Sequence, residues 1–366
     1  MSKSIHIHED ISKASTLPGW FYREATAFEQ VKEKVFSKIW HYAADEADLG
    51  ASGSVFPLTI LPGVLDEPLV FTKNTDGQLH CLSNVCTHRG KVLVENACNA
   101  GQLRCGYHGR CFHLDGHFKS MPMFDGVENF PTEKDDLTKI AFAKWAGMLF
   151  TALQPSVAWE EMIRPMQERL SWLPLDTLEF VPDASKDYLV KANWALYCDN
   201  YLEGFHIPFV HPALNQVLDF KNYHTEIFPF CNLQVGVADE GEPHFSPPEN
   251  SPDYGKKIYA YYWWVFPNLM FNFYPWGLSL NVVEPQNHQL TKVRFRSYRF
   301  KNQPFDWAQN QLDQTEIEDE SVVESVQQGI QSRFYDSGRY SVKMEKGVHH
   351  FHLLLSKFFN GKSDFS

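Results

Sequence analysis

Two short loops, each with one cysteine and one histidine, constrain the fold of this chain more than any other feature of its sequence. The first loop holds Cys86, His88 and Gly90, and the second holds Cys105 and His108. Two thiolates and two imidazoles can bind one zinc ion, or a [2Fe–2S] cluster with the thiolates on one iron and the imidazoles on the other. Zinc fingers usually pair cysteine with cysteine and histidine with histidine along the chain, whereas each of these loops mixes the two types. The pattern therefore favours the cluster over zinc.

The residues around these loops have the composition of a small all-β domain. Short runs of β-branched and aromatic residues alternate there with glycine, proline and asparagine, which predicts strands separated by tight turns. The predicted strands span residues 55–61, 69–73, 79–82, 102–104, 111–113, 117–119, 140–143 and 147–152.

The rest of the sequence predicts a second domain of another type. Apolar residues at helical spacing predict helices over residues 25–42, 157–173, 306–333 and 343–359. Strand-forming runs predict a second, antiparallel sheet from residues 186–197, 226–238, 256–266, 269–274, 278–284 and 290–300. The result is an α+β fold, which we divide into a domain with the two Cys/His loops at residues 40–155 and a second domain of residues 1–39 and 156–366.

Charge, hydropathy and cysteine count exclude several classes of protein. The 33 Lys and Arg residues against 45 Asp and Glu residues give a net charge of −12, which disfavours non-specific nucleic-acid binding. No stretch reaches the ~18 consecutive apolar residues of a membrane-spanning helix, and the N-terminus lacks the apolar run of a secretory signal. Seven cysteines, an odd number, argue against a disulfide framework. We expect a cytoplasmic protein that binds neither nucleic acid nor membrane.

A second group of polar residues lies beyond the predicted β domain. Asn200, Glu203 and His206 are spaced three residues apart, so a helix would place them along one side. His211 follows His206 by five residues, and a regular helix would turn it away by roughly 140°. Pro208 lies between the two histidines and disrupts such a helix. A broken or π-like turn would let both imidazoles converge on one atom.

An iron site built on two imidazoles needs a carboxylate from elsewhere in the chain. Two neutral imidazoles and one carboxylate form the facial triad that binds non-haem Fe(II) and leaves positions open for O₂. The best candidate is Asp319, which shares a helical stripe with the apolar residues Val322, Val326 and Ile330. Burying a carboxylate on an apolar stripe is unfavourable unless something compensates for it, and coordination to iron would do so. The alternative is a solvated acidic helix end. Glu318 and Glu320 flank the stripe, so we expect them to face solvent.

His349 and His352 form a competing candidate metal pair near the C-terminus. Their spacing is that of helical neighbours, but the apolar residues between positions 351 and 358 make the segment an ordinary amphipathic helix. We interpret both histidines as structural.

Taken in chain order, these motifs resemble those of the Rieske-type non-haem iron oxygenases, the family of aromatic-ring-hydroxylating dioxygenase alpha subunits. Both loops, the string from Asn200 to His211 and the helix around Asp319 match motifs of that family. Respiratory Rieske proteins carry one more cysteine in each loop, at positions that hold Lys91 and Tyr107 in this chain. The resemblance is therefore to the oxygenases.

The resemblance implies a fold, two cofactors and their ligands. The fold is a Rieske β domain followed by an antiparallel helix-grip catalytic domain. The ligands of a [2Fe–2S] cluster would be Cys86, His88, Cys105 and His108, and those of a mononuclear Fe(II) would be His206, His211 and Asp319. Arg110 stands where the family commonly has tryptophan, a departure that leaves every ligand in place.

The resemblance also implies partners and an electron path. An NAD(P)H-dependent flavin or iron–sulfur reductase, sometimes with a ferredoxin, would reduce the cluster in a homotrimer or an α₃β₃ assembly. Electrons would then cross from His108 of one chain to Glu203 and His206 of the next, where O₂ and a small substrate react. We therefore expect Glu203 and Asn200 to act in catalysis.

The identity of residue 203 suggests the class of substrate. The family commonly has aspartate there, and Glu203 resembles the branch that oxidises quaternary ammonium compounds of the carnitine and choline type. Aromatic faces would attract a trimethylammonium group. Candidates are the segment from Tyr259 to Phe266 and the residues Phe271, Phe273, Tyr274 and Trp276. The alternatives are a dioxygenase of an aromatic compound, an electron-transfer module with a vestigial second site, and a zinc-binding interaction protein.

Overall fold

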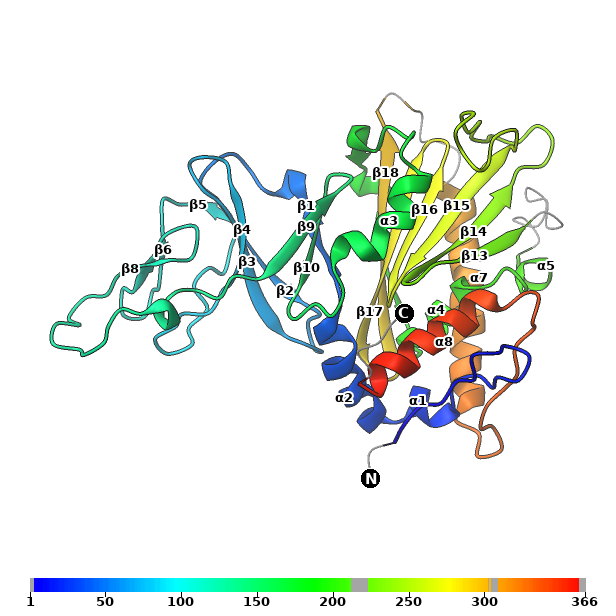
Figure 1. The fold of residues 1–366 in the computed structure, drawn as a ribbon, viewed down its shortest axis with the longest axis horizontal. Coiled ribbons are helices and arrows are strands. Elements are labelled where there is room, and N and C mark those ends of the chain that lie inside the picture. Colours follow the sequence, from blue (N-terminus) through cyan, green and yellow to red (C-terminus); the bar gives the residue numbers. More distant parts are fainter. Residues whose placement is uncertain (1–2, 212–222, 302, 304–308, 362–366) are drawn as a thin grey trace. The chain divides into compact units, whose positions relative to one another are not determined.

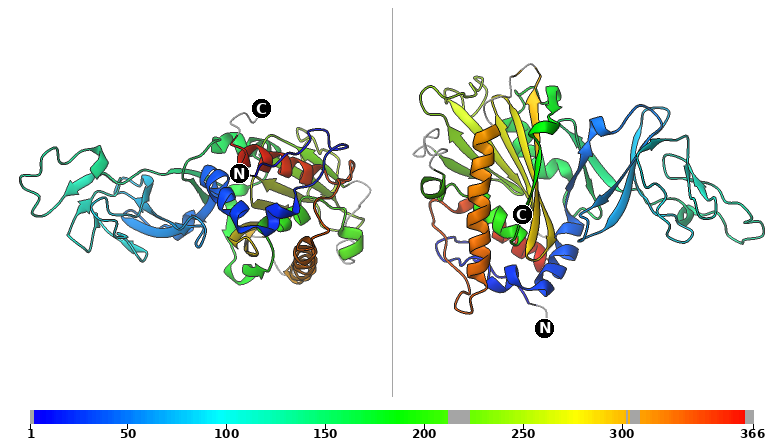
Figure 2. Two further views of the ribbon diagram at one scale, coloured as in Figure 1. Left: turned by 90° about the horizontal axis from the view of Figure 1, so that it is seen from below. Right: turned by 180° about the vertical axis from the view of Figure 1, so that it is seen from behind.

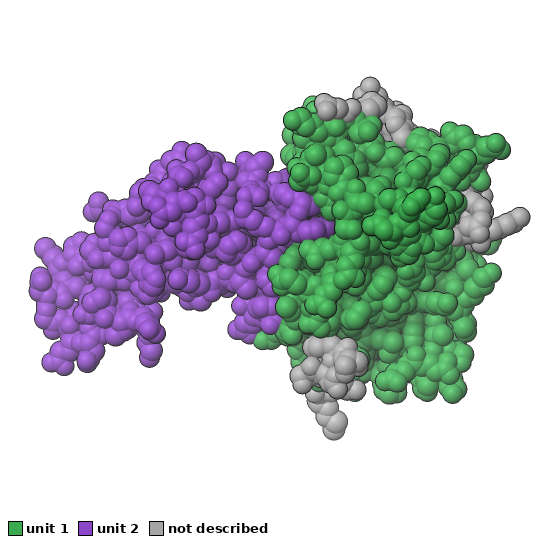
Figure 3. All heavy atoms as spheres, turned by 45° about the horizontal axis from the view of Figure 1, so that its top comes forward, with its two compact units in different colours: residues 1–39, 156–366 green, residues 40–155 purple. Residues whose placement is uncertain are grey.

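The computed structural model describes residues 3–211, 223–301, 303 and 309–361, with side chains in the last range from residue 315 onward. The chain forms two compact units, one of residues 1–39 with 156–366 and the other of residues 40–155 (Figures 1 and 3). Residues 306–308 of the helix predicted over 306–333 lie outside the described residues. Among the described residues, no helix is long and apolar enough to cross a membrane.

Residues 40–155 form the all-β unit, whose strands make three small antiparallel sheets. The first sheet has the order β1-β10-β9, from His41–Asp45, Met148–Ala152 and Ala141–Trp145. The second has the order β4-β3-β2-β5, from Leu79–Ser83, Glu67–Lys73, Ser54–Ile60 and Cys98–Asn99. The third has the order β6-β7-β8, from Leu103–Arg104, Cys111–Phe112 and Phe118–Ser120. Cys86 and Cys105 are buried in the apolar core that these sheets enclose, beside Val55, Val70 and Leu103.

The other unit is built on one eight-stranded antiparallel sheet, with the order β11-β18-β17-β16-β15-β14-β13 and with β12 also paired to β18. The strands are β11 Leu178–Phe180, β12 Lys186–Val190, β13 His224–Ile227, β14 Cys231–Val237, β15 Ile258–Val265, β16 Leu269–Tyr274, β17 Gly277–Asn287 and β18 Leu290–Phe300. Because side chains alternate along each strand, the sheet presents two different faces.

Helices cover both faces of this sheet. On one face, α3 (Trp159–Arg169) is anchored by an ion pair from Arg169 to Glu226 of β13. On the other face, Tyr201 at the end of α4 (Trp194–Tyr201) donates its hydroxyl to Asn272 of β16 at 2.7 Å. The ring of Trp264 lies on that second face too, 5.2 Å from Phe351 of α8 (Lys346–Phe359). The long helix α7 (Gln309–Ile330) runs next to α4 (Figure 2).

In the part of the chain that the structure describes, the remaining helical segments are short. They are α1 Gly19–Arg23, α2 Ala25–Lys34, α5 Ile207–Val210 and the 3₁₀ turns η1 Phe36–Lys38, η2 Glu46–Asp48, η3 Glu133–Asp135, η4 Leu175–Thr177 and η5 Pro182–Ala184.

The predicted α+β fold is confirmed, but three predicted elements were wrong in extent. The strand predicted over 186–197 ends at residue 190, because the Asn193 side chain accepts a hydrogen bond from Ala195 N at 3.0 Å and begins helix α4 there. The strand predicted over 226–238 is two strands, with a turn in which Phe228 N donates to Cys231 O at 2.9 Å. The helix predicted over 25–42 stops at Lys34 and continues as η1 and β1.

Candidate metal centres

The two cluster loops adopt the same turn. In each loop the cysteine N–H donates to the carbonyl five residues ahead, and the glycine four residues ahead donates back to the cysteine carbonyl. These bonds join Cys86 to Lys91 and Gly90, and Cys105 to Arg110 and Gly109, at 2.8–3.1 Å. The two glycines have φ of +71° and +74°, a conformation that strains any residue with a Cβ. Local sequence therefore positions each cysteine and histidine in the same way.

The four side chains of these loops form a suitable donor set for a [2Fe–2S] cluster. The rings of His88 and His108 lie 4.8 Å apart. Burial raises the pKa of Cys86. In Cys105, burial acts in the same direction, but hydrogen bonds from Tyr107 N, Cys86 and His108 N and the charge of Lys91 together lower the pKa. Burial and then the charge of His108 lower the pKa of His88, which favours the neutral imidazole that metals bind. The seven cysteines, all in described residues, are free thiols.

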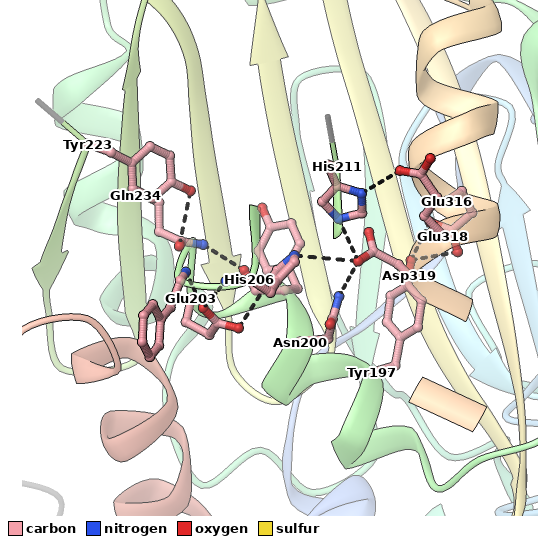
Figure 4. Close-up of polar contacts among 12 residues, drawn as sticks. Tyr197, Asn200, Glu203, His206, His211, Tyr223, Gln234, Glu316, Glu318 and Asp319 are labelled. Atoms are coloured by element: carbon pink, nitrogen blue, oxygen red, sulfur yellow. Dashed lines mark hydrogen bonds and ion pairs between the residues drawn. The ribbon is translucent and has the colours of Figure 1, made fainter. Parts of the chain in front are cut away.

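Three side chains from three segments meet at the second site (Figure 4). His206 and His211 flank the short helix α5, and Asp319 lies on α7. One ligand atom from each of the three lies within 4.8 Å of the other two. Helix α4 ends at Tyr201, before His206. Pro208 does not disrupt the helix between the histidines as we predicted: it lies in the first turn of α5, and His206 and His211 cap the two ends of that single turn, from which both imidazoles reach the same point. The residues thus fit the predicted iron site.

Asp319 Oδ1 is the atom on which this site converges. It lies 3.0 Å from His211 Nε2 and 3.5 Å from His206 Nε2. Asn200 donates its side-chain amide to the same oxygen at 2.5 Å. Both imidazoles therefore turn Nε2 toward the site, and Asn200 holds the carboxylate in place.

The Glu203 carboxylate is hydrogen-bonded to Nδ1 of His206, the ring nitrogen that points away from the candidate iron site. Glu203 Oε1 lies 2.7 Å from His206 Nδ1, and Oε2 accepts hydrogen bonds from the backbone N–H groups of Phe205 and His206. The carboxylate thereby orients the imidazole and stabilises the turn that precedes α5. Carboxylates in this position fix the tautomer of a metal-binding histidine and increase its basicity.

The Glu318 carboxylate is hydrogen-bonded to Nδ1 of His211, the ring nitrogen that points away from the candidate iron site, a role that we did not predict. We expected Glu318 to face solvent, but its side chain is only 26% exposed and its Oε2 lies 2.8 Å from His211 Nδ1. Burial lowers the pKa of His211, and the hydrogen bonds and charges of Asp319 and Glu318 more than reverse this. Glu320 is also partly buried, and burial raises its pKa. The sequence signal for Glu318 was its position next to a proposed ligand.

Glu318→Gln is therefore expected to weaken iron binding at the second site by roughly 10–100-fold, the usual effect of losing a carboxylate behind a metal-binding histidine. Equilibrium dialysis of iron(II) against the variant would measure this. Glu320→Gln is the matched control, because it removes a neighbouring carboxylate of the same helix that contacts neither imidazole in the described structure. Equal affinities for the wild type and Glu318→Gln would show that Glu318 has no such role.

The buried stripe of α7 differs from the predicted one. Val323, Gln327 and Ile330 are buried, whereas Val326, which we placed on the stripe, is 43% exposed. Asp319 lies four residues before Val323, so it still faces inward. The stripe is shifted because the face of a long helix depends on what packs against it.

His349 and His352 are structural, as expected. His352 lies 2.6 Å from Tyr340 Oη through Nδ1 and 2.7 Å from Asp199 Oδ1 through Nε2. His349 Nε2 lies 2.8 Å from the carbonyl of His8. Both rings thus have protein hydrogen-bond partners.

Comparison with protein families identifies both halves of the chain. Residues 40–131 match the Rieske [2Fe–2S] domain, and residues 175–359, just over half of the chain, match the ring hydroxylating alpha subunit catalytic domain. The chain belongs to the ring-hydroxylating alpha-subunit family. It is an oxidoreductase of the Rieske oxygenase type, and its two cofactors are a [2Fe–2S] cluster and a mononuclear iron.

Curated relatives resemble this ring-hydroxylating alpha subunit over nearly its whole length. Choline monooxygenase of Arabidopsis thaliana chloroplasts is 29% identical, over 94% of this chain and 83% of the relative. The carnitine monooxygenase oxygenase subunit of Escherichia coli K12 is 28% identical, over 95% of this chain and 94% of the relative.

Solved structures have the same fold. The quaternary ammonium Rieske monooxygenase CntA with a bound inhibitor is 25% identical with a TM-score of 0.78, covering 97% of this chain and 99% of that one. Naphthalene 1,2-dioxygenase from Rhodococcus, at 17% identity, has a TM-score of 0.74 and covers 95% of both chains. The second match shows the fold alone.

Proposed function

We propose that this protein is the oxygenase component that hydroxylates a small quaternary ammonium compound. The reaction would consume O₂, two electrons and two protons, and would give one hydroxyl group on the substrate and one water. The names of the curated relatives, which are choline and carnitine monooxygenases, support this class of substrate.

The observation that carries the proposal is a group of aromatic rings next to the candidate iron site. Tyr259, Tyr274 and Trp276 form a buried cluster with Ile207, the residue after His206. Tyr223 and Tyr262 pack against this cluster. Tyr274 lies 6.1 Å from Tyr259 and 6.0 Å from Tyr262, nearly perpendicular to both rings, and stacks on Trp276 at 4.4 Å.

These rings suit a quaternary ammonium group better than a hydrogen-bonding cation. A trimethylammonium group has no N–H to donate, so it is bound through aromatic faces. Burial raises the pKa of Tyr262 and of Tyr274, so both hydroxyls are neutral. Among the other aromatic candidates from the sequence, Trp263, Phe271 and Phe273 are fully buried on the opposite face of the sheet and form core.

We assign the ligands as the geometry suggests. Cys86, His88, Cys105 and His108 hold the cluster, and His206, His211 and Asp319 hold the iron. When bound, the mononuclear iron supplies the chemistry of O₂ activation. Asn200 holds Asp319 in position, and Glu203 and Glu318 orient the two imidazoles.

Electrons from the cluster of a neighbouring subunit would also reach the iron site through Glu203. Its two oxygens can accept about four hydrogen bonds, and bonds among the described residues occupy three of these positions. One position remains for a cluster histidine, His108, of a second chain in a homotrimer. Inter-subunit electron transfer in a quaternary ammonium Rieske monooxygenase of known structure supports this route. The electron donor would be an NAD(P)H-dependent flavin or iron–sulfur reductase, and free thiols fit a cytoplasmic location.

The substrate class can be tested by O₂ uptake with a reductase and NADH. Choline, carnitine and γ-butyrobetaine would be compared with analogues in which a tert-butyl group replaces the trimethylammonium group, and with naphthalene. We expect coupled product formation from one of the quaternary ammonium compounds only. Equal turnover of a charged compound and its neutral analogue, or turnover of naphthalene alone, would contradict the proposal.

Tyr262→Leu is expected to raise KM for the charged substrate by roughly fivefold to thirtyfold, because a desolvated cation–π contact contributes about 1–2 kcal/mol. Tyr262→Phe keeps the ring and is the matched control, with a KM near that of the wild type. Steady-state kinetics of O₂ uptake would measure both. A similar KM for Tyr262→Leu and Tyr262→Phe would remove Tyr262 from the cation site.

A further inference from the structure

Both cluster loops contact Asp135, and an ion pair with a buried arginine makes one of these contacts. Arg110 follows the second loop directly, and its side chain is only 3% exposed. Its Nη2 donates to Asp135 Oδ1 at 2.7 Å and to the Asp135 carbonyl at 3.1 Å. Asp135 is the last residue of η3. The ion pair therefore fixes the second loop to a segment 25 residues further along the chain.

The same carbonyl also holds the first cluster loop. Thr87, which lies between Cys86 and His88, donates its hydroxyl to the Asp135 carbonyl at 2.8 Å. The other carboxylate oxygen of Asp135 accepts the backbone N–H of Thr132 at 2.8 Å. Burial raises the pKa of Asp135, but the hydrogen bonds from Arg110 and Thr132 outweigh it and lower the pKa. Asp135 thus contacts both loops: its carbonyl accepts hydrogen bonds from Thr87 and Arg110, and its carboxylate is fixed by Arg110 and by Thr132 N.

Aromatic rings surround the guanidinium of Arg110 in this ion pair. The guanidinium lies over the rings of Phe112, Phe118 and Phe130, at 5.7, 4.9 and 5.4 Å. Phe130 contacts Phe124 at 4.8 Å, and Phe124 contacts the ring of His88 at 5.6 Å. A charge enclosed in this way is screened much less than one at the surface. The aromatic rings around Arg110 are thus connected through Phe124 to His88, a proposed ligand of the cluster.

We propose that the Arg110–Asp135 pair sets the reduction potential of the [2Fe–2S] cluster. Reduction adds one electron to the cluster, so the site becomes more negative by one charge. A nearby fixed cation stabilises the reduced form, and a nearby fixed anion stabilises the oxidised form. The charges of Arg110 and Asp135 therefore have opposite effects on the reduction potential. This role concerns the cluster and does not depend on the substrate.

The first loop offers a matched control. Lys91 stands five residues after Cys86, as Arg110 stands five residues after Cys105. Lys91 is 37% exposed and pairs with Glu95 at 2.9 Å on the surface. The charge of Lys91 also helps to lower the pKa of Cys105, so it does reach a cluster ligand. Because solvent and salt screen this surface pair, loss of the Lys91 charge should have a smaller effect on the cluster, and one that salt removes.

The test is a titration of the cluster-loaded full chain with dithionite as electron donor, followed by the visible and electron paramagnetic resonance spectra. Arg110→Met should lower the midpoint potential and Asp135→Asn should raise it. Each should change the one-electron equilibrium by about tenfold, which corresponds to about 59 mV. Arg110→Lys should stay near the wild type, and Lys91→Met should shift the potential less than Arg110→Met does. Any Lys91→Met shift should vanish at about 1 M salt, whereas the Arg110→Met shift should persist.

Iron and sulfide analysis of each variant shows whether the cluster is retained. Shifts of Arg110→Met and Asp135→Asn in the same direction, or no shift in either, would overturn the proposal. If Arg110→Met loses the cluster, Asp135→Asn and Arg110→Lys still decide the question. An unchanged potential in Asp135→Asn would also overturn the proposal. So would a shift in Arg110→Lys as large as the shift expected for loss of the charge.

Discussion

Asp319→Ala is expected to empty the mononuclear iron site and to abolish substrate oxidation, while the [2Fe–2S] cluster stays in place. The variant removes the oxygen on which both imidazoles converge, at 3.0 Å from His211 and 3.5 Å from His206. Two histidines alone bind iron weakly. The loss of iron affinity should therefore exceed the roughly 10–100-fold effect of removing a carboxylate, such as Glu318, that hydrogen-bonds a metal-binding histidine. Iron analysis should show a fall from about three to about two irons per chain.

Cys86→Ser is the complementary variant. It should lose the visible absorption of the Rieske cluster and keep iron at the second site, because the two centres use separate ligands. Circular dichroism would establish that both variants are folded. Loss of all iron in folded Asp319→Ala, or full iron content with activity, would contradict the assignment of Asp319.

Glu203→Gln is expected to leave both metal centres loaded and to slow the oxidation of substrate by the pre-reduced protein. Glutamine preserves hydrogen bonding to His206 and to the turn before α5 but removes the charge that supports the imidazole. Reduction of the cluster by its donor should be unchanged. Product formed in a single turnover should fall by roughly 10–100-fold. A wild-type single-turnover rate would show that Glu203 only stabilises the turn.

Mixed oligomers test whether the electron route crosses between subunits. Cys86→Ser and Asp319→Ala are each expected to be inactive alone, because one lacks the cluster and the other lacks the iron. Co-expression in one oligomer should restore some activity, since an intact cluster of one chain then faces an intact iron site of another. Activity no higher than that of the two separate variants would mean that electrons stay within one chain.

The sequence alone was sufficient for the parts of this protein that depend on local spacing. Each cluster loop is a closed turn in which the cysteine bonds to residues four and five positions ahead, so short-range sequence determines the conformation. The two histidines around α5 were found from their spacing of five residues, but the expected effect of Pro208 was wrong. Pro208 lies in the first turn of α5, where proline is tolerated, and His206 and His211 cap the two ends of this single helical turn. Asp319 was predictable from an acid on an inward-facing stripe of a long helix.

Tertiary structure decided everything that depends on contacts between distant segments. Glu318 meets His211 across 107 residues of sequence, and a helix that turns about 100° per residue leaves the face of each acid uncertain by one position. The residues from Trp194 to Tyr197, predicted as the end of a strand, lie in helix α4 because the Asn193 cap and the packing against the sheet outweigh strand propensity. Which aromatic residues flank the iron site depended on strand register, since a strand alternates its two faces at every residue. The Arg110–Asp135 pair also required the fold, because its charges come from separate segments and are brought together only when the core closes around them.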